Sequence, residues 1–229
     1  TINSNSLDGI YFKNYCYYSS IENNTIDSNL EHGINFFEGG KYSTVYNNTI
    51  KNTCFYSGSF SRGKGLEIIL QISKKLPQIN FHLYGNKDTI YDKLILEKKY
   101  KNVYFKGYLK YSKLVKKINN YKILLMPYKK KVSVLIKEIS VEKYFSPLKM
   151  FDYLASGKII LSSKLDGICE VLKHNYNSII IDKYDPKKWI EVIKNVLKNK
   201  YNLNKLRKNS ISTANKYTWN KRVIKILNA

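Results

Sequence analysis

Three segments of the sequence have the residue types and spacing that suit a phosphate-bearing ligand. The first, residues 57–65 (SGSFSRGKG), has small residues that let a ligand approach the backbone, and its Lys64 stands where a helix is expected to begin. The second is the glycine turn Gly107-Tyr108-Leu109, and the third covers residues 146–157. Because glycine turns are common in proteins without a ligand there, an ordinary loop is the alternative for the first two segments.

The third segment, SPLKMFDYLASG, carries the most specific arrangement. Ser146 is a good N-cap and Pro147 suits the first helical position. The free N–H groups of that turn attract an anion, and Lys149 adds a positive charge to the same turn. Asp152 follows one turn later, so a diphosphate on the helix start and a sugar diol on the carboxylate would fit. A capped helix with a local ion pair between Lys149 and Asp152 is the alternative.

The elements that must position these segments follow from the hydrophobic pattern. Buried strands are predicted at 54–58, 80–85, 102–107, 122–127, 158–162 and 177–182. Helical spacing of apolar residues occurs at 65–75 and at 186–199, where Asp185 is the expected cap. This alternation predicts an α/β fold with a Rossmann-like doubly wound parallel sheet. Such sheets bind ligands at the carboxyl ends of their strands, where all three segments lie.

The first 53 residues show a different rhythm, a repeat with a period of 24 residues. Thr1-Ile2 returns as Thr25-Ile26 and as Thr49-Ile50, and the apolar pairs Ile10/Ile34, Phe12/Phe36 and Ile21/Val45 keep the same offset. The repeat resembles the right-handed parallel β-helix of pectate-lyase-like proteins and amounts to about two coils. We therefore divide the chain into residues 1–53 and 54–229, and expect the coils to be part of a longer solenoid or a remnant of one.

The composition limits the classes of partner. Lys and Arg number 40 against 17 Asp and Glu, for a formal net charge of +23, and only three of the cations are Arg. So few arginines argue against a sequence-specific nucleic-acid reader. The charge suits an anionic lipid surface or a phosphate-bearing substrate, and a solvated lysine-rich surface is the plain alternative. Three scattered cysteines predict no disulfide framework, and no apolar run is long enough for a spanning helix.

Four stretches in order resemble the group 1 (family 4) glycosyltransferases: FYSGSFSRGKGLEII, NVYFKGYL, SPLKMFDYLASGKIILSS and YTWNKRVIKIL. The resemblance runs from about Cys54 to Ala229 and matches the carboxyl-terminal half of the two-domain GT-B fold. In that family this half binds a UDP- or GDP-linked sugar, and transfer retains the anomeric configuration. The nucleotide-sugar is a substrate, so the resemblance implies no cofactor, and His32, His82 and His174 lack the spacing of metal ligands.

The resemblance also assigns roles to residues. Ser57, Gly58 and Ser59 match the glycine-rich turn, where Arg62 would replace an arginine that often follows the glycine. Lys64 matches a contact to the donor diphosphate, and the stretch Gly107, Tyr108 and Leu109 matches the one beside the nucleobase. The phosphate-facing helix start is matched by Ser146, Pro147, Leu148 and Lys149. Asp152 stands where the family has a glutamate that holds the ribose hydroxyls, with a side chain one methylene shorter.

Two departures from the family bear on activity. The other family glutamate would fall at Tyr144, with Glu142 nearby but out of register, so the catalytic residues stay unassigned. The resemblance matches only the carboxyl-terminal half and not the acceptor-binding amino-terminal half, and we expect the carboxyl-terminal half alone to transfer poorly or not at all unless the other half is supplied elsewhere.

The expected function is a donor domain for cell-surface glycan or glycolipid synthesis. Such a domain would act with a glycan or lipid-linked acceptor, in the cytoplasm or peripherally on an anionic membrane. The alternative is a β-helix carbohydrate-binding surface protein whose Rossmann-like part is not catalytic.

Overall fold

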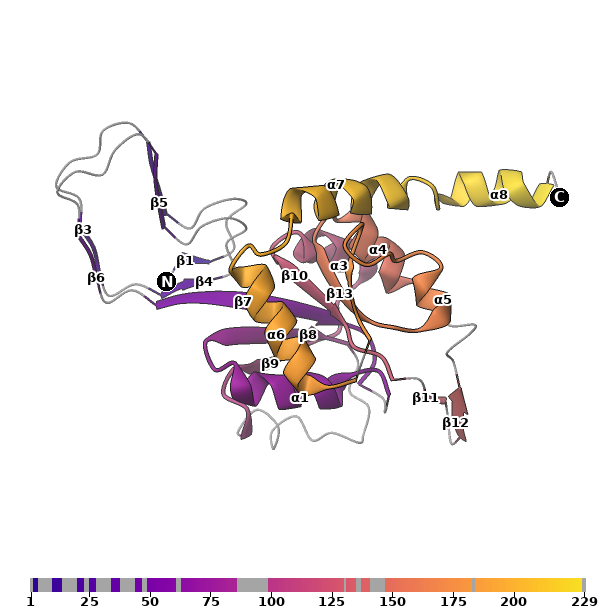
Figure 1. The fold of residues 1–229 in the computed structure, drawn as a ribbon, viewed down its shortest axis with the longest axis horizontal. Coiled ribbons are helices and arrows are strands. Elements are labelled where there is room, and N and C mark those ends of the chain that lie inside the picture. Colours follow the sequence, from indigo (N-terminus) through magenta and orange to yellow (C-terminus); the bar gives the residue numbers. More distant parts are fainter. Residues whose placement is uncertain are drawn as a thin grey trace.

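A computed structural model describes residues 2–3, 10–13, 20–22, 25–27, 34–37, 44–46, 49–60, 63–85, 99–129, 131–134, 137–140, 147–182 and 184–227. Its centre is a parallel sheet of six strands flanked by helices (Figure 1). In spatial order these strands are β9 (Val103–Gly107), β8 (Ile79–Tyr84), β7 (Thr49–Ser57), β10 (Ile123–Met126), β13 (Ile159–Ser163) and β14 (Ile179–Ile181). The six predicted strands and the doubly wound α/β fold are thereby confirmed.

The strand order reverses between β7 and β10, because β8 and β9 follow on one side and the later strands on the other. Parallel pairing joins Cys54 to Ile123 and Phe55 to Leu124 at this point. In open α/β sheets a reversal of this kind leaves a crevice at the carboxyl ends of the strands. The fold therefore predicts a ligand site beyond the end of β7.

The helices are α1 (Leu66–Lys75), α3 (Tyr111–Ile118), α4 (Lys149–Ala155), α5 (Asp166–Cys169), α6 (Pro186–Leu197), α7 (Leu203–Ala214) and α8 (Trp219–Leu227). Two apolar clusters separate them from the sheet. Cys54 and Tyr56 of β7 pack in one cluster with residues of α1 and α6, whereas Phe55 packs in the other with α3, α4 and α5. Successive side chains of a strand point to opposite faces, so a strand that is covered on both sides must be apolar throughout.

Helix α6 follows its predicted pattern closely. The Asp185 carboxylate accepts a hydrogen bond from the backbone N–H of Lys187 at 2.9 Å, and Pro186 occupies the first turn. Trp189, Ile193 and Val196 are buried against the sheet, and Val192 of the same stripe is partly buried. Capping and apolar spacing are local properties, which explains why the sequence alone predicts them.

Short strands precede the sheet and pair at the offset of the repeat. β1 (Ile2–Asn3), β4 (Thr25–Asp27) and the first part of β7 align Ile2, Ile26 and Ile50. β2 (Ile10–Lys13) pairs with β5 (Ile34–Phe37), and β3 (Ser20–Glu22) pairs with β6 (Thr44–Tyr46), each in parallel at the same 24-residue offset. The connections and the side chains of this segment lie outside the described residues, so its coiling into a right-handed β-helix stays a prediction.

Strand β7 runs through the proposed division between residues 53 and 54. Its Asn52 and Thr53 already pair with Ile79 and Asn80 of β8, while Thr49 to Lys51 pair with β4. One continuous strand thus takes part in both arrangements, with no linker between them.

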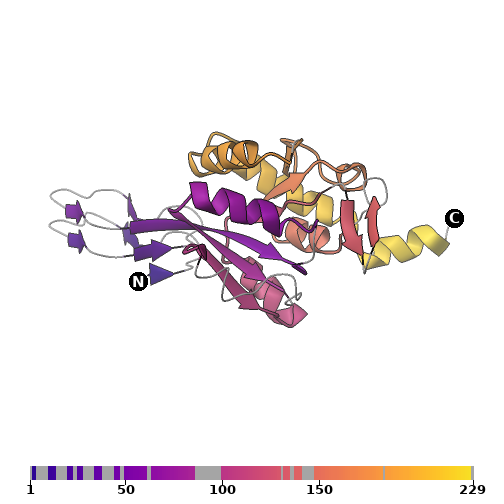
Figure 2. The ribbon, with the colours of Figure 1, turned by 90° about the horizontal axis from the view of Figure 1, so that it is seen from below.

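A hairpin and a terminal helix complete the fold. The antiparallel hairpin of β11 (Lys131–Val134) and β12 (Lys137–Ser140) lies between β10 and α4 in the sequence. Figure 2 shows the hairpin and α8 at the end of the molecule opposite the short strands. In the part of the chain that the structure describes, no helix combines the length and the hydrophobicity needed to cross a bilayer.

Candidate functional site

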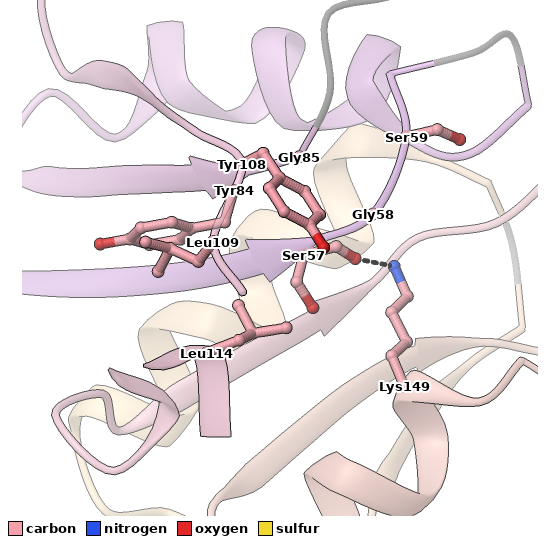
Figure 3. Close-up of a pocket in the computed structure, with 9 residues that line it drawn as sticks. All are labelled: Ser57, Gly58, Ser59, Tyr84, Gly85, Tyr108, Leu109, Leu114 and Lys149. Carbon is pink, nitrogen blue, oxygen red and sulfur yellow. Dashed lines mark hydrogen bonds between the residues drawn. The ribbon is translucent and has the colours of Figure 1, made fainter. Parts of the chain in front are cut away.

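A pocket of about 300 Å³ opens at the carboxyl ends of β7, β8 and β9 (Figure 3). Its lining comprises Ser57, Gly58, Ser59, Tyr84, Gly85, Tyr108, Leu109, Leu114 and Lys149. Six of these residues (Ser57, Gly58, Ser59, Tyr108, Leu109 and Lys149) belong to the set predicted from the sequence. The other three, Tyr84, Gly85 and Leu114, were not in that set. Tyr84 and Gly85 end the predicted strand 80–85, so the position of that strand end could have pointed to them.

Glycines allow the strand ends that form the pocket to approach one another. The N–H of Gly58 donates to the Tyr84 carbonyl at 2.9 Å, and the N–H of Gly85 donates to the Gly107 carbonyl at 3.0 Å. A Cβ atom on Gly85 would lie only 1.9 Å from the Gly58 carbonyl oxygen. These glycines therefore serve the packing of one strand end on the next, in addition to leaving the backbone open to a ligand.

Lys149 is the charged group at the centre of the site. Figure 3 shows its side chain extending from α4 to the end of β7, where the ammonium donates to the Ser57 carbonyl at 2.7 Å. The same ammonium lies 4.0 Å from the centroid of the Tyr56 ring and 4.7 Å from that of Tyr128. The Lys149 ammonium therefore contacts a carbonyl and the faces of two aromatic rings, and does not form the ion pair with Asp152 that was the alternative expectation.

Burial lowers the pKa of Lys149 well below its ordinary value, and the nearby charge of Lys64 lowers it further. Burial also lowers the pKa of Lys64, whose ammonium lies 5.8 Å from the Tyr128 centroid. Two cations with reduced access to water thus lie close enough to repel each other. An anion between them would relieve that repulsion.

A second layer of tyrosines holds the end of β7 in place. The Tyr153 hydroxyl accepts a hydrogen bond from the Ser57 N–H at 3.0 Å and lies 3.1 Å from the Ser57 hydroxyl. The Tyr56 hydroxyl donates to the Ser59 carbonyl at 2.8 Å. Sequence reasoning missed these tyrosines and Tyr128, because the chain has 21 tyrosines and nothing local distinguishes those that meet a lysine.

The loop from Gly63 to Gly65 carries Lys64 toward the site. Gly65 has a φ of +102°, and a Cβ on it would lie 2.3 Å from the Pro127 carbonyl oxygen. The Gly63 N–H donates to the Glu67 carboxylate at 3.3 Å. The loop therefore depends on glycine both for its backbone conformation and for its contact with the segment after β10.

Asp152 lies beside the pocket, one helical turn after Lys149. Its carboxylate accepts a hydrogen bond from the Tyr111 hydroxyl of α3 at 2.7 Å. Burial raises the pKa of Asp152, and the bond from Tyr111 opposes that rise. The carboxylate thus has a partner that the sequence did not predict, from a residue 41 positions away.

The start of α4 differs from the expectation. The helix begins at Lys149, two residues after Pro147, because the first turn is tighter: Met150 N–H donates to the Pro147 carbonyl at 2.9 Å and Phe151 N–H to the Leu148 carbonyl at 3.0 Å. Leu148 is 74% exposed. Ser146, the expected N-cap, lies outside the described residues, as do Arg62, Glu142 and Tyr144.

The sequence profile of the family "Glycosyl transferases group 1" matches residues 45–216. This chain belongs to that family. The match confirms the resemblance that the four sequence stretches indicated, and it places the pocket of this glycosyl transferase chain within the matched region. No match to the chain is found among curated proteins.

Solved structures share the fold at low sequence identity. Sucrose-phosphate synthase from Thermosynechococcus elongatus aligns with a TM-score of 0.64 and 17% identity over 77% of this chain and 44% of its own. HepE from Anabaena, solved with UDP and glucose, has a TM-score of 0.59 and 14% identity over 83% of this chain and 58% of its own. The C-terminal domain of a group 1 glycosyl transferase from Francisella tularensis has a TM-score of 0.56 and 12% identity over 72% of this chain and 85% of its own.

These coverages define which part of a glycosyltransferase the chain represents. The chain spans about half the length of the synthase and of HepE but most of the isolated C-terminal domain. The structure therefore corresponds to the C-terminal half of a GT-B fold, as the sequence predicted.

Proposed function

We propose that this chain binds the diphosphate of a UDP- or GDP-linked sugar in the pocket at the end of β7. The observation that carries the proposal is the position of Lys149, which lines the pocket beside the small residues Gly58 and Ser59 and lies close enough to Lys64 for the second charge to lower its pKa. Charge-assisted hydrogen bonds to phosphate strengthen where water is scarce. The solved complex of HepE with UDP and glucose supports a nucleotide-sugar as the ligand class.

The remaining pocket wall suits the nucleoside. Tyr108 is 67% exposed and lines the pocket with Leu109 and Leu114, so its ring is open to stack on a base. Asp152, one turn from Lys149, offers a carboxylate to the hydroxyls of the ribose.

In the proposed reaction, the bond between the anomeric carbon and the diphosphate oxygen breaks as the oxygen of an acceptor hydroxyl bonds to that carbon with retention of configuration, and the hydroxyl proton passes to the leaving diphosphate. Negative charge then grows on the leaving diphosphate, and Lys149 and Lys64 stabilise it. Transfer also requires an acceptor site and exclusion of water, which the family's other half provides, so we propose that this chain alone transfers poorly. We place its role in cell-surface glycan or glycolipid synthesis, in the cytoplasm or peripherally at a membrane.

Calorimetric titration of the whole chain with UDP, GDP and their glucose and mannose conjugates tests the proposal. We expect saturable binding of at least one nucleotide family, with the free diphosphate retaining most of the affinity because the cations contact that group. Absence of binding by all of them would reject the proposal.

Binding of the diphosphate should weaken as the pH rises. The lowered pKa of Lys149 means that the empty site disfavours the ammonium, whereas a bound diphosphate favours it and raises that pKa again. The complex therefore holds more protons than the free protein, and the association constant falls by up to about tenfold per pH unit between the two pKa values. Titrations from about pH 7 to about pH 9, above the second pKa of phosphate, measure this slope. A flat or rising affinity would contradict it.

A second candidate function is polysaccharide binding by residues 1–53. The parallel pairing of β1 with β4 and of β4 with β7, at the offset of the repeat, favours this candidate, since stacked strands form extended surfaces. Affinity for a polysaccharide without any affinity for nucleotides would select this candidate over the first.

A further inference from the structure

A short hydrogen bond joins the two helices that border the pocket. The Tyr111 hydroxyl of α3 donates to Oδ1 of Asp152 of α4 at 2.7 Å. Each helix also sends a residue into the pocket lining, and Figure 3 shows these two residues, Leu114 and Lys149. Leu114 follows Tyr111 by one turn, and Lys149 precedes Asp152 by one turn. The pair therefore lies one helical turn from the pocket on both helices, on the same helix faces.

The pair presents acceptors in an arrangement that suits a diol. A carboxylate has two oxygens, and among the described residues Tyr111 is the only hydrogen-bond partner of the Asp152 carboxylate, at Oδ1. A hydroxyl that donates to a carboxylate keeps its own oxygen as an acceptor. Oδ2 of Asp152 and the hydroxyl oxygen of Tyr111 can thus accept one hydrogen bond each, which matches the two O–H donors of a vicinal diol.

The exposure of the two side chains is consistent with a binding role. Tyr111 is 64% exposed, whereas Asp152 is partly buried, so a ligand reaches the tyrosine hydroxyl more readily than the carboxylate. The tyrosine also limits rotation of the short aspartate side chain, which reduces the conformational entropy lost when the ligand binds.

We propose that Tyr111 is a positioning residue that holds Asp152 and supplies the second acceptor for the ribose diol of the donor nucleotide. The inference rests on the proposed function, because it takes a nucleoside diphosphate as the ligand. It adds a specificity element: the site discriminates ribonucleotides from nucleotides that lack the two hydroxyls.

The test compares UDP or GDP, whichever the wild type binds, with its 2′,3′-dideoxy analogue. We expect the Tyr111→Phe variant to bind the ribonucleotide about 5- to 20-fold more weakly and the dideoxy analogue as well as the wild type does. The matched control is Tyr176→Phe, at an exposed tyrosine of the turn after α5, which should change neither affinity. Equal losses of affinity for both nucleotides, or no loss for either, would show that the Tyr111 hydrogen bond only joins α3 to α4, and would overturn the inference.

A second variant tests whether the length of the side chain at position 152, and not the folding of the protein, explains the loss of affinity. If Tyr111 compensates for the short side chain of Asp152, then adding Asp152→Glu to Tyr111→Phe should restore the preference for the ribonucleotide over its dideoxy analogue. We expect the logarithm of the ratio of the two affinities to recover at least half of what Tyr111→Phe lost. A merely structural bond between the helices would not be rescued in this way, so failure of the rescue also contradicts the inference. If the wild type binds neither nucleotide, the proposed function fails and this inference fails with it. If the wild type binds the ribonucleotide and its dideoxy analogue equally well, only this inference fails.

Discussion

Replacing Lys149 with methionine should weaken nucleoside diphosphate binding by about 30- to 1,000-fold, or about 2–4 kcal/mol. The variant removes a cation that lies against the Ser57 carbonyl and the rings of Tyr56 and Tyr128. In this partly buried setting a charge-assisted hydrogen bond to phosphate is worth more than at an exposed site. Calorimetry with the diphosphate measures the loss.

The same substitution should leave the fold intact. The lowered pKa of Lys149 shows that burial opposes its charge, so methionine removes a desolvation cost while losing one hydrogen bond to Ser57. We expect the free energy of unfolding to change by no more than about 1 kcal/mol. Lys188→Met is the matched control, because it removes an exposed lysine paired with Glu191 on α6. Equal loss of affinity in both variants would indicate a general charge effect and contradict a specific site.

The pH slope of binding should disappear together with the lysine. The Lys149→Met variant retains Lys64 but lacks the group whose pKa rises most on binding, so its residual affinity should vary little over the pH range in which the wild type loses affinity. An unchanged slope would assign the proton uptake to another group.

Replacing Gly85 with alanine should destabilise the protein by about 2–4 kcal/mol and abolish measurable nucleotide binding. The new Cβ would lie 1.9 Å from the Gly58 carbonyl oxygen and 2.8 Å from the Gly58 carbonyl carbon. Backbone atoms cannot rotate away as a flexible side chain does, so the ends of β7 and β8 must separate and the pocket floor must change shape. Urea unfolding gives the stability, and calorimetry of the folded variant gives the binding.

Gly107→Ala provides the control for backbone strain. Gly107 has a φ of +74°, but a Cβ atom added to it would meet nothing within 4 Å, so alanine there should cost only about 1–2 kcal/mol. Gly107 precedes the pocket residue Tyr108, yet its Cβ would point into open space, and binding should be largely kept. A Gly85→Ala variant no less stable than Gly107→Ala would show that the strand ends separate more easily than the structure implies.

The elements of the sheet could be predicted because they depend on local patterns. A strand covered by helices on both sides must be apolar at every position, so the runs in β10 and β13 identify them without knowledge of their neighbours. Capping of α6 by Asp185 depends on residues within one turn. Even the location of the pocket follows from the rule that parallel sheets bind ligands at the carboxyl ends of their strands.

The details of the site could not be predicted in the same way. The sequence indicates that Lys149 and Asp152 lie one turn apart on a helix, but an ion pair between them and separate roles for each are equally compatible with that spacing. The choice depends on Ser57, which lies 92 residues before Lys149, and on Tyr111, which lies 41 residues before Asp152. No local rule relates residues so far apart.

By itself the sequence determined the family, the six parallel strands and the segments that surround the pocket. Only the tertiary structure decided that Lys149 contacts Tyr56 and Tyr128, that Tyr111 holds Asp152, and that Gly85 serves the packing of β8 on β7. The physical reason is that hydrophobic periodicity and helix capping act over a few residues, whereas desolvation, hydrogen-bond partners and close backbone contacts arise when distant strand ends and helices are brought together.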